Sequence, residues 1–232
     1  MLDVIVLCEG QTEREFCRSL ISPFLFAAGI SLAGTLVGKP GRKRGGIQEW
    51  ETYRSEVLRL AKERDRRHVC VMVDYYSMPS SWPGRERANT KTIATRGRIV
   101  EESLVADLSA EIGARFHPCV QLHEFESLLF VDPKRTAMSI ATGGGLGSHD
   151  HVRLGAQLAA IRSGCGPSVE HIDDSPATAP SKRLLSVIPG YDKVAWGVTA
   201  ASDIGVAALR GGCPWLDRWL TRLETSAGST NG

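Results

Sequence analysis

The sequence lacks the features that mark several classes of protein. None of its apolar runs approaches the roughly 20 residues that a membrane-spanning helix requires, and the longest, from Leu20 to Leu32, is interrupted by Pro23 and Gly29. No basic segment precedes the first apolar run, which argues against a signal peptide. We therefore expect a cytoplasmic protein with no membrane partner.

Cysteines with metal-binding or redox spacing are also absent. The six cysteines are scattered, without a Cys-x-x-Cys motif and without the Cys/His spacing of a zinc site. Cys8, Cys70 and Cys119 fall inside apolar runs, where a buried thiol is the simplest interpretation. We therefore expect neither a disulfide framework nor zinc.

Charge of one sign is not in excess. The 28 Lys and Arg residues and 26 Asp and Glu residues give a formal net charge of +2, so bulk positive charge is not the means by which this chain would bind nucleic acid. The basic residues do cluster, for example at residues 41–46, 64–68 and 181–183. Such clusters are usually solvated surface and less often phosphate contacts.

Strand and helix patterns alternate in the first part of the chain. Apolar, β-branched runs at residues 3–8, 29–38, 68–76 and 115–122 are typical of buried strands. Helical periodicity lies between them, at residues 47–65 and 98–112 and in a helix that starts near residue 12. This order predicts an α/β fold with a mainly parallel sheet of about four strands, flanked by helices.

The first of these helices has a start signal. Thr12 and Glu15 have the spacing of a capping box, and Phe16, Leu20 and Phe24 recur at helical spacing on the face expected to meet the sheet.

Past Phe130 the pattern becomes helical. Helices are expected near residues 152–163, 181–187, 193–210 in one or two pieces, and 215–223, with Ser181 as the cap of the second. The glycine-rich residues 142–150 are typical of a flexible connector. We therefore expect an α/β core over residues 1–132, a helical region over residues 133–224 packed on or beside that core, and a disordered tail over residues 225–232.

Carboxylates stand at the ends of three expected strands. They are Glu9 after the first strand, Asp74 after the third, and Glu124 with Glu126 after the fourth. Because the carboxyl ends of parallel strands share one edge, these side chains can converge there. Clustered carboxylates repel one another unless a cation lies among them, and Mg²⁺ or Mn²⁺ prefers oxygen ligands. One or two such ions can act on a phosphodiester.

Each acid also has an ordinary structural explanation. Glu9 and Glu13 can favour the positive end of the helix that follows them. Asp74 can cap a turn, and Glu124 and Glu126 can be first-turn acids of a helix. The repetition at strand ends is what favours the joint interpretation.

Three blocks, "VLCEGQTERE", "VMVDYY" and "PCVQLHEFESLLF", resemble the Toprim fold as found in OLD-type nucleases, and more closely an uncharacterised bacterial Toprim-like family, a domain of unknown function. The later "SPATAPSKRL", "GYDKV" and "CPWLDRWL" extend the resemblance over nearly the whole chain. It implies a Toprim-like fold and Mg²⁺ held by a glutamate after the first strand and an Asp-x-Asp after a later one. Glu9 matches the glutamate and Asp74 the first aspartate, but Tyr76 occupies the second position.

The missing aspartate leaves one metal ligand open. Our hypothesis is that Glu124 or Glu126 supplies this carboxylate, with Glu13 as a further candidate; if none does, the site binds without cutting. Basic residues around the site would hold substrate phosphates. The candidates are Arg42, Lys43, Arg44, Lys182, Arg183 and Lys193.

The leading hypothesis is a Toprim-like, metal-dependent nuclease of DNA or RNA. OLD-type nucleases pair a Toprim domain with an ABC/AAA-type ATPase, so the resemblance implies a separate ATPase partner, because this chain has no P-loop, and a role in anti-phage defence. The alternative is a catalytically silent Toprim-like module that binds nucleic acid or a partner. A phosphotransferase or phosphatase with Asp74 as nucleophile ranks last. The oligomeric state stays open, with a homo-oligomer as one option.

Overall fold

The structure is a computed structural model that describes residues 1–38, 44–143, 150–166, 168–172 and 178–230. The chain divides into two compact units, which we describe separately. Unit 1 comprises Met1–Leu122 and Arg218–Gly232, and unit 2 comprises His123–Asp217. The division thus follows Leu122, whereas the sequence suggested a boundary after residue 132.

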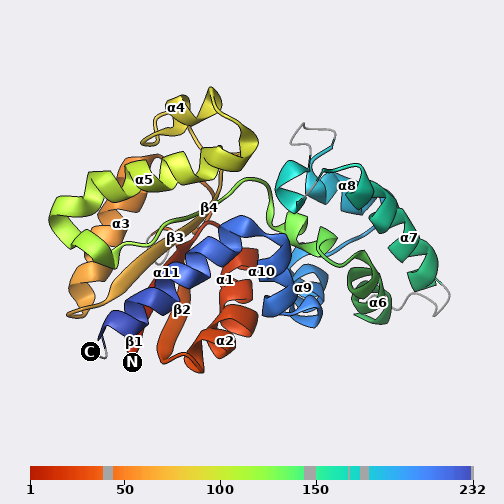
Figure 1. Cartoon of the computed structure of the whole chain (residues 1–232), viewed down its shortest axis with the longest axis horizontal. Helices are drawn as coiled ribbons and strands as arrows, with labels where there is room; N and C mark the ends of the chain where they lie inside the picture. Colours follow the sequence, from red (N-terminus) through yellow and green to blue (C-terminus); the bar gives the residue numbers. More distant parts are fainter. Residues whose placement is uncertain (39–43, 144–149, 167, 173–177, 231–232) are drawn as a thin grey trace. The chain divides into compact units, whose positions relative to one another are not determined.

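Unit 1 is built on a four-stranded sheet (Figure 1). Its strands follow the order β2-β1-β3-β4, and every neighbouring pair is parallel. The predicted α/β fold with a parallel sheet is therefore confirmed. The strands are β1 Leu2–Cys8, β2 Ile30–Leu36, β3 His68–Asp74 and β4 Cys119–Gln121.

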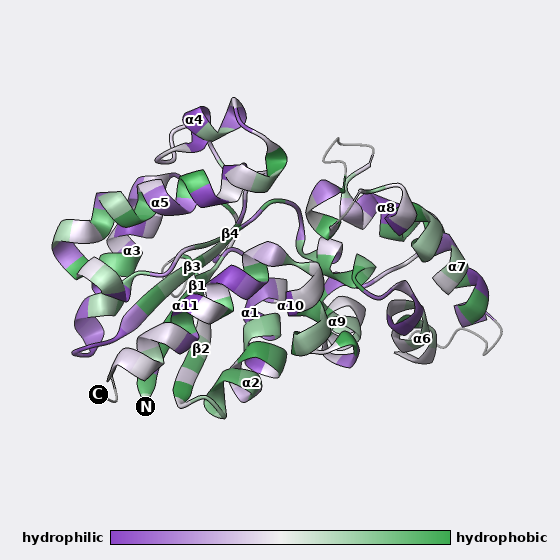
Figure 2. Ribbon diagram, in the orientation of Figure 1, coloured by the Kyte–Doolittle hydropathy of each residue, from purple (hydrophilic) through white to green (hydrophobic). Residues whose placement is uncertain are grey.

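Helices lie between the strands of unit 1, and one more, α11, follows near the end of the chain. They are α1 Gln11–Phe16, the π-helical turn η1 Cys17–Ile21, α2 Ser22–Phe26, α3 Trp50–Glu63, α4 Arg85–Asn89, α5 Ile93–Ile112, the 3₁₀ turn η2 Gly113–Arg115, and α11 Pro214–Thr230, which belongs to unit 1 from Arg218 onward. Hydrophobic and hydrophilic residues alternate along α5 and α11, as expected of helices that pack on a sheet with one face (Figure 2).

One face of the sheet packs against α3 and α5. Val71 of β3 and Val120 of β4 share a buried hydrophobic cluster with Val57 of α3 and Leu104 of α5. The buried residues of α3 recur at helical spacing along one face; they are Trp50, Tyr53, Val57, Leu60 and Ala61. On the other face, α11 is tied to the segment before β4, because Arg222 Nη2 donates a hydrogen bond to the Pro118 carbonyl oxygen at 2.7 Å.

The first helical segment corrects two expectations. Gly10 is the N-cap residue of α1 and no side chain caps it; Thr12 is buried, while Glu15 pairs with Arg18. The predicted capping box is therefore wrong. The π-helical turn η1 also inserts an extra residue per turn, which rotates the buried face onto Ile21 and Leu25 and leaves Phe24 exposed.

Unit 2 is helical, as the pattern past Phe130 predicted. It differs from the sequence prediction in two respects: α6 was not anticipated, and residues 193–210 fall in three helical segments. Its elements are η3 Phe125–Phe130, α6 Pro133–Gly143, α7 Asp150–Ser163, η4 Val169–His171, α8 Pro180–Val187, η5 Lys193–Gly197, α9 Val198–Ile204 and α10 Val206–Gly212. Residues 144–149 of the expected connector lie outside the described part of the chain.

Three further sequence expectations concern the membrane, the cysteines and the tail. None of the helices in the described ranges combines the length and the apolar character needed to cross a bilayer. All six cysteines are buried free thiols, so the buried-thiol interpretation is confirmed. Helix α11 continues to Thr230, over residues for which the sequence suggested disorder.

Candidate functional site

The carboxyl ends of β1 and β3 meet where the strand order reverses. The chain passes from β1 to β2 on one side and later places β3 on the other side of β1, and ligands of parallel α/β sheets bind outside the strand ends at such a point. Glu9 follows β1 directly, and Asp74 is the last residue of β3. Glu9 Oε2 accepts a hydrogen bond from the Asp74 backbone N–H at 3.2 Å. Two of the predicted acids therefore lie side by side.

Two donors fix the orientation of these carboxylates. The Gln121 side chain, which is 1% exposed at the end of β4, donates from Nε2 to Asp74 Oδ1. The Ser77 hydroxyl donates to Glu9 Oε1 at 3.4 Å. Hydrogen bonds to charged oxygens are stronger than neutral ones and offset part of the repulsion between neighbouring acids. The edge is thus organised around two directed carboxylates.

Glu13 belongs to the same edge. Its side chain is 5% exposed, and Oε2 lies 2.8 Å from the position that a Cβ at Gly10 would occupy. Glycine at position 10 therefore leaves room for a third carboxylate next to Glu9. The structure brings Glu13 to this place, where the sequence proposed it as a further ligand.

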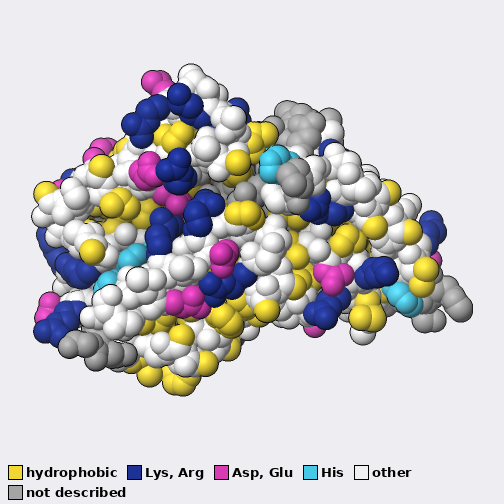
Figure 3. Space-filling view, in the orientation of Figure 1, with side chains coloured by type: hydrophobic (Ala, Val, Ile, Leu, Met, Phe, Trp, Pro, Cys, Tyr) yellow, Lys and Arg dark blue, Asp and Glu magenta, His cyan; other side chains and the backbone are white. Residues whose placement is uncertain are grey.

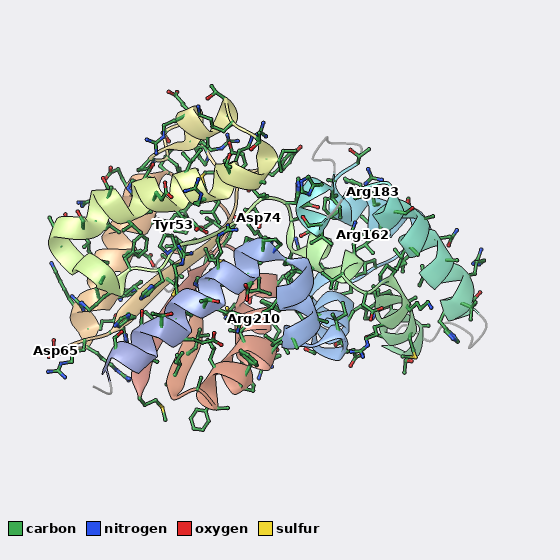
Figure 4. All side chains as sticks on the ribbon, viewed as in Figure 1. Tyr53, Asp65, Asp74, Arg162, Arg183 and Arg210 are labelled. Atoms are coloured by element: carbon green, nitrogen blue, oxygen red, sulfur yellow. The ribbon has the colours of Figure 1, made fainter. Side chains whose placement is uncertain are left out.

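Tyr53 of α3 adds a buried hydroxyl to the edge (Figure 4 labels Tyr53 and Asp74). Its pKa is raised above the ordinary tyrosine value, first by burial and then by the negative charges of Glu9, Glu13 and Asp74 among others. The hydroxyl is buried and has no hydrogen-bond partner within the described ranges. A buried donor in the field of three acids fits a site that takes up water or a hydrated cation.

Gly45 and Gly46, in the described part of the glycine-rich basic loop, pack against the same edge. Gly46 donates its backbone N–H to the Glu9 carbonyl oxygen at 2.7 Å, and Gly45 adopts φ +88°, with only 2.9 Å between its Cβ position and that oxygen. The sequence suggested Arg44 as a phosphate contact, but in the structure its guanidinium donates to the Gly38 carbonyl oxygen at 3.0 Å and to the Thr35 hydroxyl at 2.9 Å. Its role here is to fasten the loop to β2.

The other two cations of this loop, Arg42 and Lys43, lie outside the described residues. Tyr76, which stands where the resemblance calls for a second aspartate, is 40% exposed. That position therefore supplies no carboxylate.

Unit 2 gathers a second set of predicted residues. Glu124 Oε2 accepts a hydrogen bond from the Ser181 backbone N–H at 2.9 Å, in the first turn of α8. Ala179 is the N-cap residue of α8, and no side chain of its own caps that helix. The expectation that Ser181 caps α8 is therefore wrong, because the Glu124 carboxylate from a distant segment does so.

Glu126 and Lys193 form an ion pair in unit 2. Glu126 is 1% exposed, and its Oε2 lies 3.0 Å from Lys193 Nζ. Burial raises the pKa of Glu126, while the Lys193 charge acts to lower it. Tyr191, two residues before Lys193, has a pKa raised by burial and then by the Glu126 charge. The motifs around residues 124–126 and 191–193 thus meet in one polar cluster.

Lys182 and Arg183 occupy the first turn of α8. Lys182 is exposed, and Arg183 Nε donates to the Thr178 carbonyl oxygen at 2.7 Å. Cations at a helix start are disfavoured by the helix dipole. The Glu124 carboxylate at the same helix end offsets that penalty, so the presence of Lys182 and Arg183 there has a structural explanation.

Whether the acids of unit 2 join those of unit 1 in one site stays a prediction. In the described part of the chain, no three His, Cys, Asp or Glu side chains form a group suited to hold a metal ion. The sequence reasoning also missed Tyr53, Ser77 and Gln121. The only signal for Gln121 was its place at the end of a strand, next to the acids.

Two comparisons give no relative, and one identifies a family. Neither the curated proteins nor the solved structures contain a match to this chain. A family model described as "Domain of unknown function (DUF4276)" matches residues 8–224. The matched range includes every acid and every cation discussed above.

Proposed function

The chain belongs to this family of domains of unknown function, and on that premise we propose that it is a metal-dependent nuclease that cleaves phosphodiester bonds in DNA or RNA. The observation that carries the proposal is the pairing of Glu9 with Asp74 at the reversal of the strand order. The sequence resemblance to the Toprim domain of OLD-type nucleases points to the same two residues.

The residues at this edge fit Mg²⁺ or Mn²⁺. Mg²⁺ usually keeps several waters and is held by one or two carboxylates together with substrate phosphates, so a complete set of protein ligands is not required. Glu9 and Asp74 would hold the ion, with Glu13 as a further candidate ligand. When bound, the ion would polarise the phosphodiester and lower the pKa of a water molecule.

The chain's own side chains would orient the reacting groups. Gln121 and Ser77 act as positioning residues, because each donates to one of the two carboxylates. The Tyr53 hydroxyl offers a further donor to water at the edge. Arg42 and Lys43, which the sequence suggests as phosphate contacts, lie outside the described residues.

A second candidate is a silent Toprim-like module that binds nucleic acid or a partner. Tyr76 in place of an aspartate favours it, as does the lack of a three-residue metal group among the described residues. The ATPase partner, the anti-phage role and a homo-oligomer are proposals that rest on the resemblance alone.

The decisive experiment measures cleavage of supercoiled plasmid and of structured RNA in Mg²⁺ or Mn²⁺. The variants are Asp74→Asn, which keeps an acceptor for Gln121, and Glu9→Gln. Loss of an ion that stabilises the transition state by several kcal/mol lowers the rate by at least about a hundredfold. We expect that loss in both variants, together with loss of Mn²⁺ binding in calorimetry.

Glu51→Gln is the matched control, because Glu51 is an exposed acid of α3; it should cleave like the wild type. If the wild-type protein cleaves neither plasmid nor RNA and does not bind Mn²⁺, the nuclease proposal is contradicted and the silent module is favoured. Glu124→Gln and Glu126→Gln then test whether the acids of unit 2 take part.

A further inference from the structure

Positive charge is concentrated in one segment of unit 1, residues 84–98, which we call the basic segment. It contains α4 and the start of α5. Five Arg or Lys residues and one Glu give it a formal charge of +4, whereas the whole chain carries +2. Figure 3 shows Lys and Arg side chains gathered over α4 at the top of the view. The five cations are Arg85, Arg87, Lys91, Arg96 and Arg98.

Most of these cations have no acid to neutralise them. In the described part of the chain only Arg98 forms an ion pair, an exposed one with Glu102. Arg87 donates to the Ser103 hydroxyl and Arg96 to the Lys91 carbonyl oxygen, which leaves their charges in place. The basic segment therefore presents net charge to solvent.

Some arginines elsewhere in unit 1 are paired with acids, whereas Arg44 and Arg115 donate to backbone carbonyl oxygens. Arg54 binds Asp107 and Glu111, and Arg67 binds Asp3 and Glu63. The basic segment differs in concentration, because four cations that form no ion pair in the described part of the chain lie within its 15 residues of sequence. This local excess of positive charge points to a polyanionic ligand of the basic segment.

The basic segment is anchored at the edge that holds Asp74. The Arg85 guanidinium lies 3.8 Å from the ring centre of Tyr75, the residue after Asp74, and donates to its hydroxyl at 2.8 Å. At the other end, Gly97 approaches β4 so closely that its Cβ position is 2.9 Å from the Val120 carbonyl oxygen. The residue after Val120 is Gln121, which binds Asp74. Both ends of the segment thus contact the neighbours of the carboxylates.

The chemistry next to the segment suits a phosphate backbone. A hollow of about 470 Å³ beside α4 is lined by Ser80, Ser81, Ser103 and Arg87, and also by Gly84, Glu86 and the buried Trp82. Phosphate contacts in nucleic-acid complexes come from such hydroxyls and cations. The basic segment has no aromatic residue, and single-strand binders stack bases on aromatic rings. The contacts available are therefore to the backbone rather than to the bases.

We propose that the basic segment binds the phosphate backbone of a double-stranded nucleic acid and positions it at the Glu9/Asp74 edge. This binding would not depend on the nucleotide sequence. This inference deepens the proposed function and rests on it for the role of that edge. The binding surface itself requires no metal.

The test measures fluorescence anisotropy of a labelled DNA duplex with the full chain in EDTA, over a series of salt concentrations. A duplex of RNA and a single DNA strand serve as comparison probes. The variant Arg87→Ala/Lys91→Ala/Arg96→Ala removes three unpaired cations. Each phosphate contact contributes about 0.9 to the slope of log affinity against log salt, so we expect the slope to fall by about 2.7 and the affinity by roughly tenfold or more.

Two further variants keep the result interpretable. Arg87→Lys/Lys91→Arg/Arg96→Lys keeps the charges and should keep the affinity. Arg59→Ala/Arg64→Ala removes two exposed but paired arginines, whose exposed ion pairs are weak, so affinity should change by no more than about twofold. Thermal melts check that each variant is folded.

The outcomes separate this inference from the proposed function. Salt-dependent duplex binding that the triple alanine variant loses, without cleavage by the wild type in Mn²⁺, would support the basic segment and contradict the nuclease. Equal binding and equal cleavage by wild type and triple variant would overturn the inference alone. Tighter binding of the single strand, or binding of poly-glutamate in place of any duplex, would also overturn it.

Discussion

His68, which is half-buried at the start of β3, contacts the buried His117, away from the carboxylates. His68 Nδ1 lies 2.7 Å from His117 Nε2, and the two rings stack at 5°. Burial, then the charges of His68 and Arg222, lower the pKa of His117 to about 3. Burial and the Arg115 charge also lower the pKa of His68. Both rings are therefore neutral in the native protein at pH 7.

This pair makes stability depend on pH. A histidine whose folded pKa lies below its unfolded value of 6.5 stabilises the fold above pH 6.5 and loses that contribution as the pH falls toward 3. For His117 the loss at pH 5 is about 2 kcal/mol, at 1.36 kcal/mol per pH unit. Urea denaturation at pH 7 and at pH 5 measures this difference in the free energy of unfolding.

His117→Phe should remove most of this pH dependence, because no titrating group remains at the buried position. His151→Gln, in α7, is the control and should follow the wild type. An unchanged fall in stability between pH 7 and pH 5 in His117→Phe would assign the effect to other groups.

Helix α5 depends on a glycine for its contact with the sheet. Gly97 brings the first turns of α5 against β4, where Glu101 Oε1 accepts a hydrogen bond from the Val120 N–H at 3.0 Å. Arg222 of α11 pairs with the same Glu101 at 3.1 Å. Helix α5, helix α11 and β4 are thus joined at one buried carboxylate.

The same substitution should have opposite effects in two helices. Gly97→Ala gains about 1 kcal/mol of helix propensity, but the Cβ would lie 2.9 Å from the Val120 oxygen, so we expect a net destabilisation of about 1–3 kcal/mol. Gly228→Ala in α11 has no neighbour within 4 Å of the new Cβ and should stabilise by up to about 1 kcal/mol. Thermal melts of both variants measure these changes in stability. A Gly97→Ala variant more stable than the wild type would contradict the close contact between α5 and β4.

The thiols report on the folded molecule as a whole. All six cysteines are buried and free, and burial raises the pKa of Cys70 to about 12. The thiolate is the reactive species, so buried thiols with raised pKa react slowly.

A thiol reagent should therefore titrate six cysteines in denaturant. With the native protein, the reaction should be limited by the rate at which local or global unfolding exposes the thiols. Ser229→Cys, at an exposed position of α11, is the positive control and should add one fast thiol. A fast phase in the unaltered native protein would show that a cysteine is accessible.

Much of unit 1 followed from local pattern. The strands and the buried face of α3 were predictable, because apolar runs and apolar periodicity depend only on residues that are close together in the sequence. The positions of Glu9 and Asp74 at strand ends followed from the same pattern. The basic segment was not anticipated, because only its last residue, Arg98, falls in an expected helix and local pattern does not show which residues share a surface.

Contacts between distant residues needed the tertiary structure. Gln121 and Asp74, or Glu124 and Ser181, are 47 and 57 residues apart, and nothing in either local sequence specifies the partner. The π-helical turn that exposes Phe24 and buries Leu25 depends on how the helix packs on the sheet. The apolar, β-branched runs in the sequence thus determined the strands and the acids at their ends. Packing between elements decided which side chains hold those acids, because hydrogen bonds and close contacts depend on distance in space rather than along the chain.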